Sequence, residues 1–323
     1  MTAPPFEHDA RQAEVLAHGP GPLLVTGPAG TGKTTVLRER FARLIEGGAD
    51  PERVAIVVGS SRARDEARAA LLDRLPTSLP GLQVVTIHGL ANRVLRDGYA
   101  SLGYAEPPQI LSAAEQFAKV QELLANEEST DWPAYGALLA MRGFADEVRQ
   151  FLLRAQEELR TPDEIRAGGA ARGLFGWHEL AGFLETYQEL LDDLGVVDFA
   201  ALVQRAAAAA THGASAFDHV LVDDYQDTTF GGEALLGALR PGSLLVAANP
   251  EAHVFSFQGT TPVPLERFAQ TFPGAANIAL DQRHRAPSAP DVRAWVAPHA
   301  SEEHAGIARE LRRLHVEEGV PWS

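Results

Sequence analysis

Eight residues near the beginning of the chain have the types and spacing needed to hold the phosphates of a nucleotide. Residues 27–34 read G-P-A-G-T-G-K-T and fit the pattern G-x-x-x-x-G-K-[ST]. Glycines let backbone N–H groups approach phosphate oxygens, the lysine adds a positive charge near the β- and γ-phosphates, and the last hydroxyl can ligate Mg²⁺. We therefore predict binding of ATP with Mg²⁺. The residues expected to bind it are Gly27, Pro28, Ala29, Gly30, Thr31, Gly32, Lys33, Thr34 and Thr35.

The segments on either side of this loop must place it correctly. Residues 21–26 are predicted to form a short buried strand, and residues 34–46 a helix. A loop between them puts the phosphates at a helix N-terminus, where the helix dipole favours anions. An ordinary glycine-rich turn is the alternative, and the agreement between the motif and its flanks favours the nucleotide site.

A second group of residues that could serve the same chemistry lies much later in the chain. Residues 217–224 are predicted to form an apolar strand that ends in Asp223 and Asp224. This resembles a Walker B element, in which the first acid holds Mg²⁺ and the second polarises the attacking water. Solvated acids at a strand end are the alternative. The loop at 27–34 favours the catalytic interpretation, with Thr34 and Asp223 as the Mg²⁺ ligands.

The composition restricts the kind of protein. The chain has 28 basic and 43 acidic residues, a formal net charge of −15 and no cysteine. A protein that coats nucleic acid is usually basic, so contact with DNA or RNA would be local, through a groove. Disulfides and thiolate metal sites are excluded. Residues 1–11 lack the apolar segment of a signal peptide, and the apolar runs are too short to span a bilayer, so we expect a cytoplasmic protein without membrane contact.

The order of predicted elements indicates an α/β fold with a parallel sheet, because short strands alternate with amphipathic helices. Strands are predicted at residues 23–26, 54–58, 83–86, 217–223 and 243–248. Residues 106–194 have helical periodicity, with a capping pattern at 161–164 and no convincing strand. A further strand at 291–296 and a helix at 302–318 cannot bury a core by themselves, so we expect the chain to be cut off inside its next domain.

The residues after the second acidic strand carry a family resemblance. Residues 223–228 read D-D-Y-Q-D-T and resemble the D-E-[FY]-Q-D-T signature of superfamily 1 helicases of the UvrD/Rep/PcrA type. Further segments are similar to other motifs of this family and follow in its order, at residues 9–12, 58–63, 86–90, 198–202, 255–259 and 283–285. The resemblance covers residues 6 to about 296.

The resemblance implies a fold and a domain organisation. It implies a P-loop NTPase with a RecA-like parallel sheet, in which residues 1–105 and 195–287 form the discontinuous ATP-binding core. Residues 106–194 would be an inserted all-helical subdomain, and residues 288–323 the truncated start of a second RecA-like core.

The resemblance also assigns roles to individual residues. Gln12 would read adenine, and Arg285 would reach the γ-phosphate. The catalytic set would be Lys33, Asp223, Asp224, Gln226 and Arg285. Contacts with single-stranded DNA would come from Ser60, Ser61, Arg62, Thr86, His88, Phe255 and Phe257. The three aromatic side chains of this set could stack on bases, and burial in the core is the alternative for each.

Three positions depart from the family pattern. Asp224 stands where the family has glutamate, Ala252 where it has the glutamine that senses the γ-phosphate, and Gln258 where it has arginine. A shorter acid would hold the attacking water less well, and alanine cannot make the glutamine's hydrogen bond. These departures indicate reduced or specialised ATPase activity. A narrower resemblance, to the AdnA subunits of actinobacterial helicase–nucleases, implies a second, AdnB-like subunit as a partner.

The function expected from these observations is that of an ATP-dependent DNA helicase or translocase motor fragment. The resemblance implies movement from 3′ to 5′ on single-stranded DNA or at a junction between duplex and single strand, in repair or recombination. The fragment alone is expected to be weakly active or inactive. The alternative is a nucleotide-binding regulatory or scaffold subunit with a degenerate motor in a helicase–nuclease complex. A metabolic P-loop kinase would leave residues 86–89 and 255–259 unexplained.

Overall fold

The computed structural model of the chain describes residues 8–75, 79, 81–214, 216–253, 260–285 and 295–322. The chain divides into two compact units, Met1–His284 and Arg285–Ser323.

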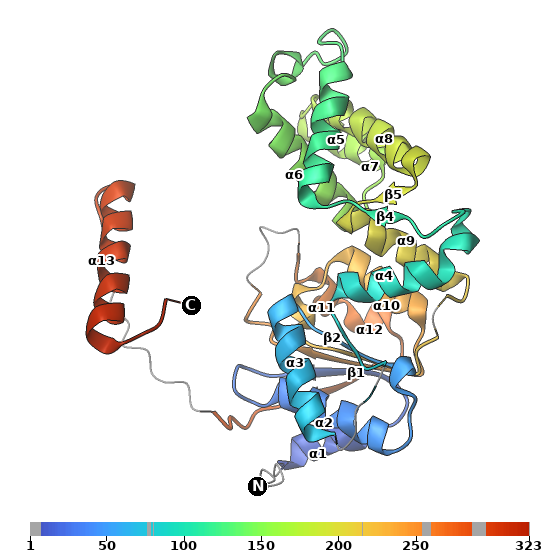
Figure 1. Ribbon diagram of the computed structural model, residues 1–323, viewed down its shortest axis with the longest axis vertical. Helices are drawn as coiled ribbons and strands as arrows, with labels where there is room; N and C mark the ends of the chain where they lie inside the picture. Colours follow the sequence, from blue (N-terminus) through green and yellow to red (C-terminus); the bar gives the residue numbers. More distant parts are fainter. Residues whose placement is uncertain are drawn as a thin grey trace. The chain divides into compact units, whose positions relative to one another are not determined.

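A six-stranded parallel sheet forms the centre of the first unit, with the strand order β3-β2-β6-β7-β1-β8 (Figure 1). Its strands are β1 (Gly21–Thr26), β2 (Val54–Val57), β3 (Gln83–Val85), β6 (His219–Val222), β7 (Ser243–Ala248) and β8 (Ala276–Ala279). The predicted α/β fold with a parallel sheet is therefore confirmed. The edge strand β8 was not predicted, because its sequence A-N-I-A has neither a continuous apolar run nor a clear alternation.

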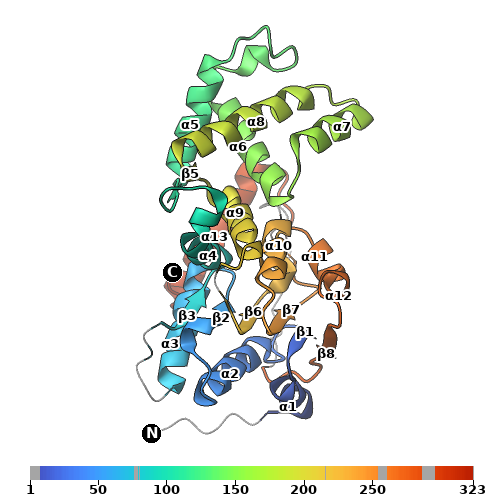
Figure 2. The same cartoon turned by 90° about the vertical axis from the view of Figure 1, so that its right-hand side faces the viewer.

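Helices cover both faces of this sheet, which explains why β2 and β7 are buried along their whole length (Figure 2). One face packs against α1 (Ala10–Ala17), α2 (Lys33–Glu46) and α3 (Ser61–Arg74). The other face packs against α4 (Ile87–Gly98), α9 (Phe199–Thr211) and α10 (Phe230–Leu239). The shorter helices are α11 (Val263–Glu266), α12 (Phe268–Thr271), η1 (Pro51–Arg53), η2 (Tyr99–Leu102), η3 (Gly136–Leu138) and η4 (Tyr225–Asp227).

Four helices between β3 and β6 share a hydrophobic cluster of their own. They are α5 (Ala113–Asn126), α6 (Arg142–Glu157), α7 (Pro162–Arg172) and α8 (Trp177–Leu194). The predicted cap is confirmed, since the Thr161 hydroxyl accepts from the Glu164 N–H and the Glu164 carboxylate accepts from the Thr161 N–H. The expectation of no strand in this region is wrong at one place. β4 (Gln109–Ile110) pairs with β5 (Val196–Val197), and two residues are too short to show a period.

A buried carboxylate joins these helices to the core. Asp198 is 1% exposed and caps α9, where Oδ1 accepts from the Ala201 N–H at 2.8 Å. Its Oδ2 accepts from the side chains of Gln116 (2.9 Å), Gln156 (3.1 Å) and Tyr187 (2.9 Å), which belong to α5, α6 and α8. One side chain therefore fixes three inserted helices to the start of a core helix.

The described residues of the second unit form one helix, α13 (Ala300–Glu318), and none of its residues is buried. The helix predicted at 302–318 is confirmed and begins two residues earlier. Of the strand predicted at 291–296, residues 291–294 lie outside the described residues. Trp295 and Val296 are not in a strand, so the prediction is wrong for them, and no other described residue of this unit offers a strand to pair with.

Candidate functional site

The phosphate-binding motif forms the turn between β1 and α2. Gly27 continues the strand by donating its N–H to the Ala248 carbonyl at 3.2 Å. Gly30 and Gly32 have φ angles of 86° and 83°, a left-handed backbone that favours glycine. A Cβ on Gly27 would lie 2.5 Å from the Leu280 carbonyl oxygen. The loop therefore needs its glycines both for its turn and for its packing against the chain after β8.

Lys33 is the first residue of α2 and folds back over the loop. Its Nζ donates to the carbonyl of Gly27 at 2.6 Å and to that of Pro28 at 3.0 Å. Burial lowers the pKa of Lys33, while the charges of Asp223 and Asp224 oppose that shift. The ammonium group thus lies between the predicted phosphate loop and the predicted acids, although more than 180 residues separate them in the sequence.

Asp223 follows β6 and is held by a bond from its N–H to the Val57 carbonyl at 2.8 Å. Its side chain is 9% exposed and is hydrogen-bonded to the Thr34 hydroxyl. Burial raises the pKa of Asp223, the neighbouring charge of Asp224 raises it further, and the bond from Thr34 opposes both. The two predicted Mg²⁺ ligands are therefore in contact.

This donor set fits Mg²⁺ bound together with a nucleotide. Mg²⁺ commonly uses one or two protein oxygens and completes its octahedron with phosphates and water. Among the described residues no group of three or more His, Asp or Glu side chains is arranged to hold a metal by itself. A site built from one hydroxyl and one carboxylate suits a metal that arrives with its phosphates.

Asp224 is exposed and has a left-handed backbone, with φ 52° and ψ 42°. Gln226, which is 3% exposed, donates its Nε2 to Asp224 Oδ1 and to Asp227 Oδ2, both at 3.2 Å. Its Oε1 accepts from the Asn249 N–H at 2.9 Å. Gln226 therefore orients the exposed acid and links it to the residues after β7.

Gln12 lies beside the phosphate loop and is fully buried. Its Oε1 accepts from the Asp9 N–H at 3.2 Å, and its Nε2 donates to the Thr31 carbonyl at 3.1 Å. In this arrangement the Gln12 side chain connects the phosphate loop to the residue that caps α1. Recognition of adenine by Gln12 stays a prediction, because both ends of the amide are engaged within the protein.

His284 was not predicted as a site residue, although it stands inside the motif at 283–285. Its N–H donates to the Gly30 carbonyl at 2.9 Å, and its Nε2 lies 2.8 Å from Asp9 Oδ2. Burial would raise the pKa of Asp9, but hydrogen bonds from the Gln12 backbone and from His284 outweigh it and lower that pKa. His284 thus ties the phosphate loop to the cap of α1. The sequence feature that could have identified His284 is its position beside Arg285 in the motif at 283–285. Arg285 itself is exposed and begins the second unit.

The residues predicted to touch DNA follow two neighbouring strands of the sheet. Ser60 caps α3 after β2, and Thr86 caps α4 after β3. Ser61 and Arg62 are exposed, and Arg62 pairs with Glu66 at 2.9 Å. Because β2 and β3 are parallel and adjacent, both segments lie at the carboxyl edge of the sheet. Phe255, Phe257 and the departure at Gln258 lie outside the described residues.

His88 is packed against an aromatic ring that was not predicted to take part. Its ring meets Phe199 edge to face, with centroids 5.4 Å apart. Burial lowers the pKa of His88. Phe199 is 45% exposed, so of this pair it presents the more accessible face. The sequence did point to this region, because residues 198–202 resemble a family motif, but no DNA contact was predicted for Phe199.

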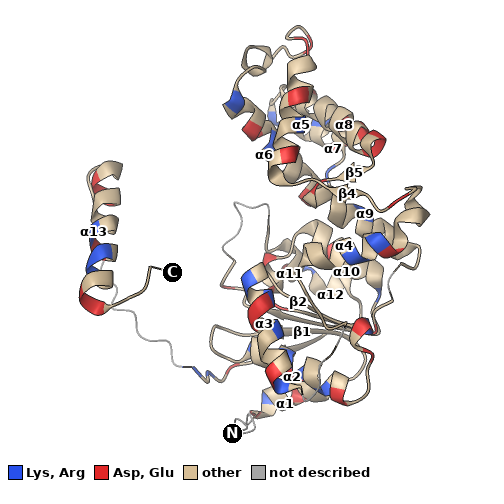
Figure 3. Cartoon of the chain, viewed as in Figure 1, with Lys and Arg blue, Asp and Glu red and all other residues tan. Residues whose placement is uncertain are grey.

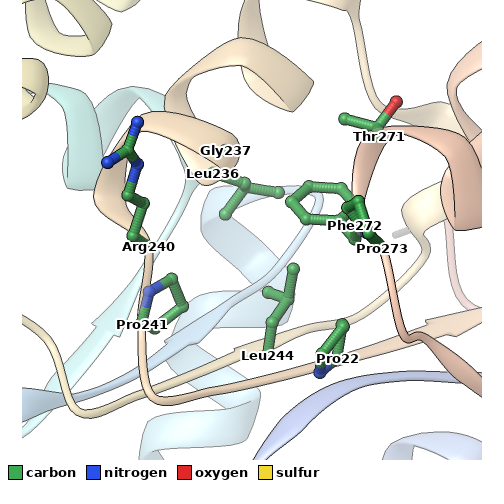
Figure 4. A pocket seen from close by; sticks show the side chains of 9 residues that line it. All are labelled: Pro22, Leu236, Gly237, Arg240, Pro241, Leu244, Thr271, Phe272 and Pro273. Atoms are coloured by element: carbon green, nitrogen blue, oxygen red, sulfur yellow. The ribbon is translucent and has the colours of Figure 1, made fainter.

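A separate hollow of about 280 Å³ lies away from these residues (Figure 4). It adjoins Pro22 and Leu244, at the amino ends of β1 and β7, whereas the phosphate loop follows the carboxyl end of β1. Its lining is mainly apolar, with Arg240 as its charged side chain. It lacks the convergent polar groups that a nucleotide site requires.

Charged residues of both signs lie along α3, as Figure 3 shows. In the described part of the chain, no helix is both long enough and apolar enough to cross a bilayer.

The family described as the UvrD/REP helicase N-terminal domain matches residues 8–273. The chain belongs to this family. Among its relatives, the Escherichia coli (strain K12) protein named DNA helicase II is 29% identical over 290 residues, which are 86% of this chain and 38% of that protein. The Mycobacterium tuberculosis (strain H37Rv) protein named ATP-dependent DNA helicase UvrD1 is 24% identical over 85% of this chain and 37% of its own length.

A third relative, the Salmonella typhimurium protein named ATP-dependent DNA helicase Rep, is 24% identical over 82% of this chain and 39% of its own length. The chain thus spans less than two fifths of the length of these relatives. Membership of the UvrD/REP family agrees with the six-stranded parallel sheet and with the loop and acids at its carboxyl edge.

Proposed function

We propose that this UvrD/REP-family chain is the ATP-binding part of a DNA helicase or translocase motor. The observation that carries the proposal is the meeting of Lys33, Thr34 and Asp223 at the carboxyl edge of the sheet. A lysine, a hydroxyl and a carboxylate at this point are the groups that hold the phosphates and Mg²⁺ of ATP. The family match and the names of the relatives support DNA as the polymer on which the motor acts.

Each group has a proposed task in hydrolysis. Lys33 leaves the Gly27 and Pro28 carbonyls and binds the β- and γ-phosphates, while backbone N–H groups of the loop bind the remaining oxygens. Thr34 and Asp223 would hold Mg²⁺, which when bound would neutralise charge on the phosphates of the nucleotide. Asp224 orients the attacking water, held by Gln226. Water attacks the γ-phosphorus, the bond to the ADP oxygen breaks, and the products are ADP and inorganic phosphate.

The finer features of this proposal rest on the family resemblance. We propose movement from 3′ to 5′ on single-stranded DNA and a role in repair or recombination. We also propose the division into a discontinuous RecA-like core, an inserted helical subdomain at 106–194 and the start of a second core after residue 287. The separate hydrophobic cluster of α5–α8 supports the inserted helical subdomain at 106–194.

We further propose an AdnB-like second subunit, which would supply motor activity that Asp224 and Ala252 weaken in this chain. The support is the narrower resemblance to AdnA subunits, together with the departures at these two positions. Co-expression of the complete gene product with a second UvrD-family protein of the same genome, followed by size-exclusion chromatography, tests it. Elution of the complete product as a monomer beside every such protein would contradict the second subunit.

Nucleotide binding is the decisive test of the main proposal. Lys33→Ala should lower the affinity for a fluorescent ATP analogue with Mg²⁺ at least tenfold, because it removes the ammonium group that lies over the loop. Lys119→Ala is the matched control, since Lys119 is the one other lysine and pairs with Glu122 on the inserted helices. Equal affinities for the two variants would contradict an ATP site at this loop.

The metal ligands allow a second measurement. Asp223→Ala should weaken Mg·ATP binding more than it weakens binding of metal-free ATP, because the lost carboxylate acts through the metal. If the substitution weakens ATP binding equally in the presence of Mg²⁺ and of a chelator, Asp223 is not a ligand of the metal. Within the complete gene product, unwinding that survives Lys33→Ala would favour the scaffold alternative.

A further inference from the structure

His253 follows β7 and lies against the acidic segment that carries Asp224. Its Nδ1 is 3.0 Å from the Gln226 carbonyl oxygen and 3.3 Å from Asp227 Oδ1. The side chain is 14% exposed. The preceding residue, Ala252, has no polar side chain with which to make such a contact.

The contacts of Nδ1 determine which nitrogen of His253 carries a proton. Both neighbouring atoms are oxygens, and a carbonyl or carboxylate oxygen can only accept. Nδ1 therefore carries the hydrogen and donates it. The Nε2 atom is buried and has no hydrogen-bond partner among the described residues. The orientation of the ring thus depends on the Nδ1 side alone.

The same glutamine receives a second contact from the residues after β7. Gln226 accepts from the Asn249 N–H through Oε1, and its Nε2 donates to Asp224 Oδ1. Its backbone is held by His253 and its side chain by Asn249. A side chain held in this way places the exposed carboxylate of Asp224 in one orientation.

We propose that His253 is a positioning residue for hydrolysis, which holds Gln226 and through it the acid Asp224. This rests on the proposed function for its catalytic consequence, and on the structure alone for the contact. His253 provides a polar link between the acidic segment and the residues after β7 that Ala252 cannot provide. His253 does not touch the reacting atoms; it acts on Asp224 through two successive hydrogen bonds, one to Gln226 and one from Gln226 to Asp224. Loss of His253 should therefore lower the rate of hydrolysis and leave nucleotide affinity nearly unchanged.

Three substitutions of His253 distinguish the role of Nδ1 from that of Nε2. The amide nitrogen of asparagine lies where Nδ1 lies, and the amide nitrogen of glutamine lies near Nε2. His253→Ala and His253→Gln should remove the bond to Gln226, and His253→Asn should retain it.

The first measurement needs neither nucleotide nor activity. Amide hydrogen exchange of Asn249, followed by NMR in the 323-residue chain, reports whether Gln226 stays in place, because that amide donates to Gln226 Oε1. We expect exchange at least fivefold faster in His253→Ala and His253→Gln, and a rate within twofold of the parent in His253→Asn. An unchanged Asn249 rate in His253→Ala would overturn the positioning role.

The second measurement is single-turnover ATP hydrolysis with the same variants in the complete gene product. The alanine and glutamine variants should lose roughly five- to tenfold in rate, which corresponds to one hydrogen bond, with dissociation constants for ATP within twofold. Equal rates in all variants would overturn the catalytic part. If Lys33→Ala leaves ATP binding intact, the proposed ATP site fails, while the Asn249 measurement still decides the contact made by His253.

Discussion

Glu157 offers a test of the buried junction between the inserted helices and the core. It is the last residue of α6, and its Oε2 is buried without a hydrogen-bond partner among the described residues. Burial raises the pKa of Glu157 from 4.5 to about 7, the charge of Asp198 adds to this shift, and Arg154 opposes it. Between pH 4.5 and about 7, Glu157 therefore keeps its proton in the folded protein but has lost it in the unfolded chain.

The direction of the pH dependence follows from this difference. Because the folded-state pKa is the higher one, the free energy of unfolding falls as pH rises from 4.5 towards 7 and stays lowered above that range. The gap between the two values corresponds to at most about 3 kcal/mol. Glu157→Gln removes the ionisable group. The substitution should therefore stabilise the protein more at pH 8.5 than at pH 5.5, by about 2 kcal/mol.

Urea unfolding at the two pH values measures this difference. Tryptophan fluorescence suits the purpose because Trp132 is 3% exposed within the cluster of the inserted helices. Glu158→Gln is the matched control, since it removes the same charge at the next position, where the side chain is 39% exposed and pairs with Arg160. An equal gain at both pH values, or the same pH dependence in the control, would refute the reasoning.

Three further predictions concern the junction, the phosphate loop and the acid. Asp198→Ala removes four buried hydrogen bonds and should lower the free energy of unfolding by about 3 kcal/mol or more; hydrogen exchange along α5, α6 and α8 should accelerate, whereas substitution of the exposed Asp192 by alanine should not accelerate it. Gly32→Ala should reduce ATP affinity at least tenfold, because its Cβ would lie 2.5 Å from a buried glutamine nitrogen; Gly48→Ala has a similar φ but open space, so titration should show near-parent affinity. Asp224→Glu in the complete gene product should raise kcat with little change in ATP affinity, since a longer acid holds the attacking water better; an unchanged or lower kcat in steady-state assays would contradict this.

Those parts of the molecule that depend on neighbouring residues could be predicted before the fold was known. Residues 27–34 specify a phosphate loop because glycine, lysine and hydroxyl must occupy fixed places in one turn. The buried strands β2 and β7 were predictable because both faces are covered, which requires a continuous apolar run. The helix cap at Thr161 was also predictable, because its partner, Glu164, is only three residues away in the sequence.

Features that depend on residues far apart in the chain became visible only in the folded protein. Strand β8 is stabilised by pairing with β1, so its own four residues carry little signal. The sequence could not reveal that Gln12 is enclosed behind the loop, because its partner Thr31 is brought to it only by the packing of α1 against α2. The donors that surround Asp198 come from three helices, and His253 meets Gln226 only because β6 and β7 are neighbours. Hydrogen bonds of this kind depend on positions in space, and spacing along one sequence does not record them.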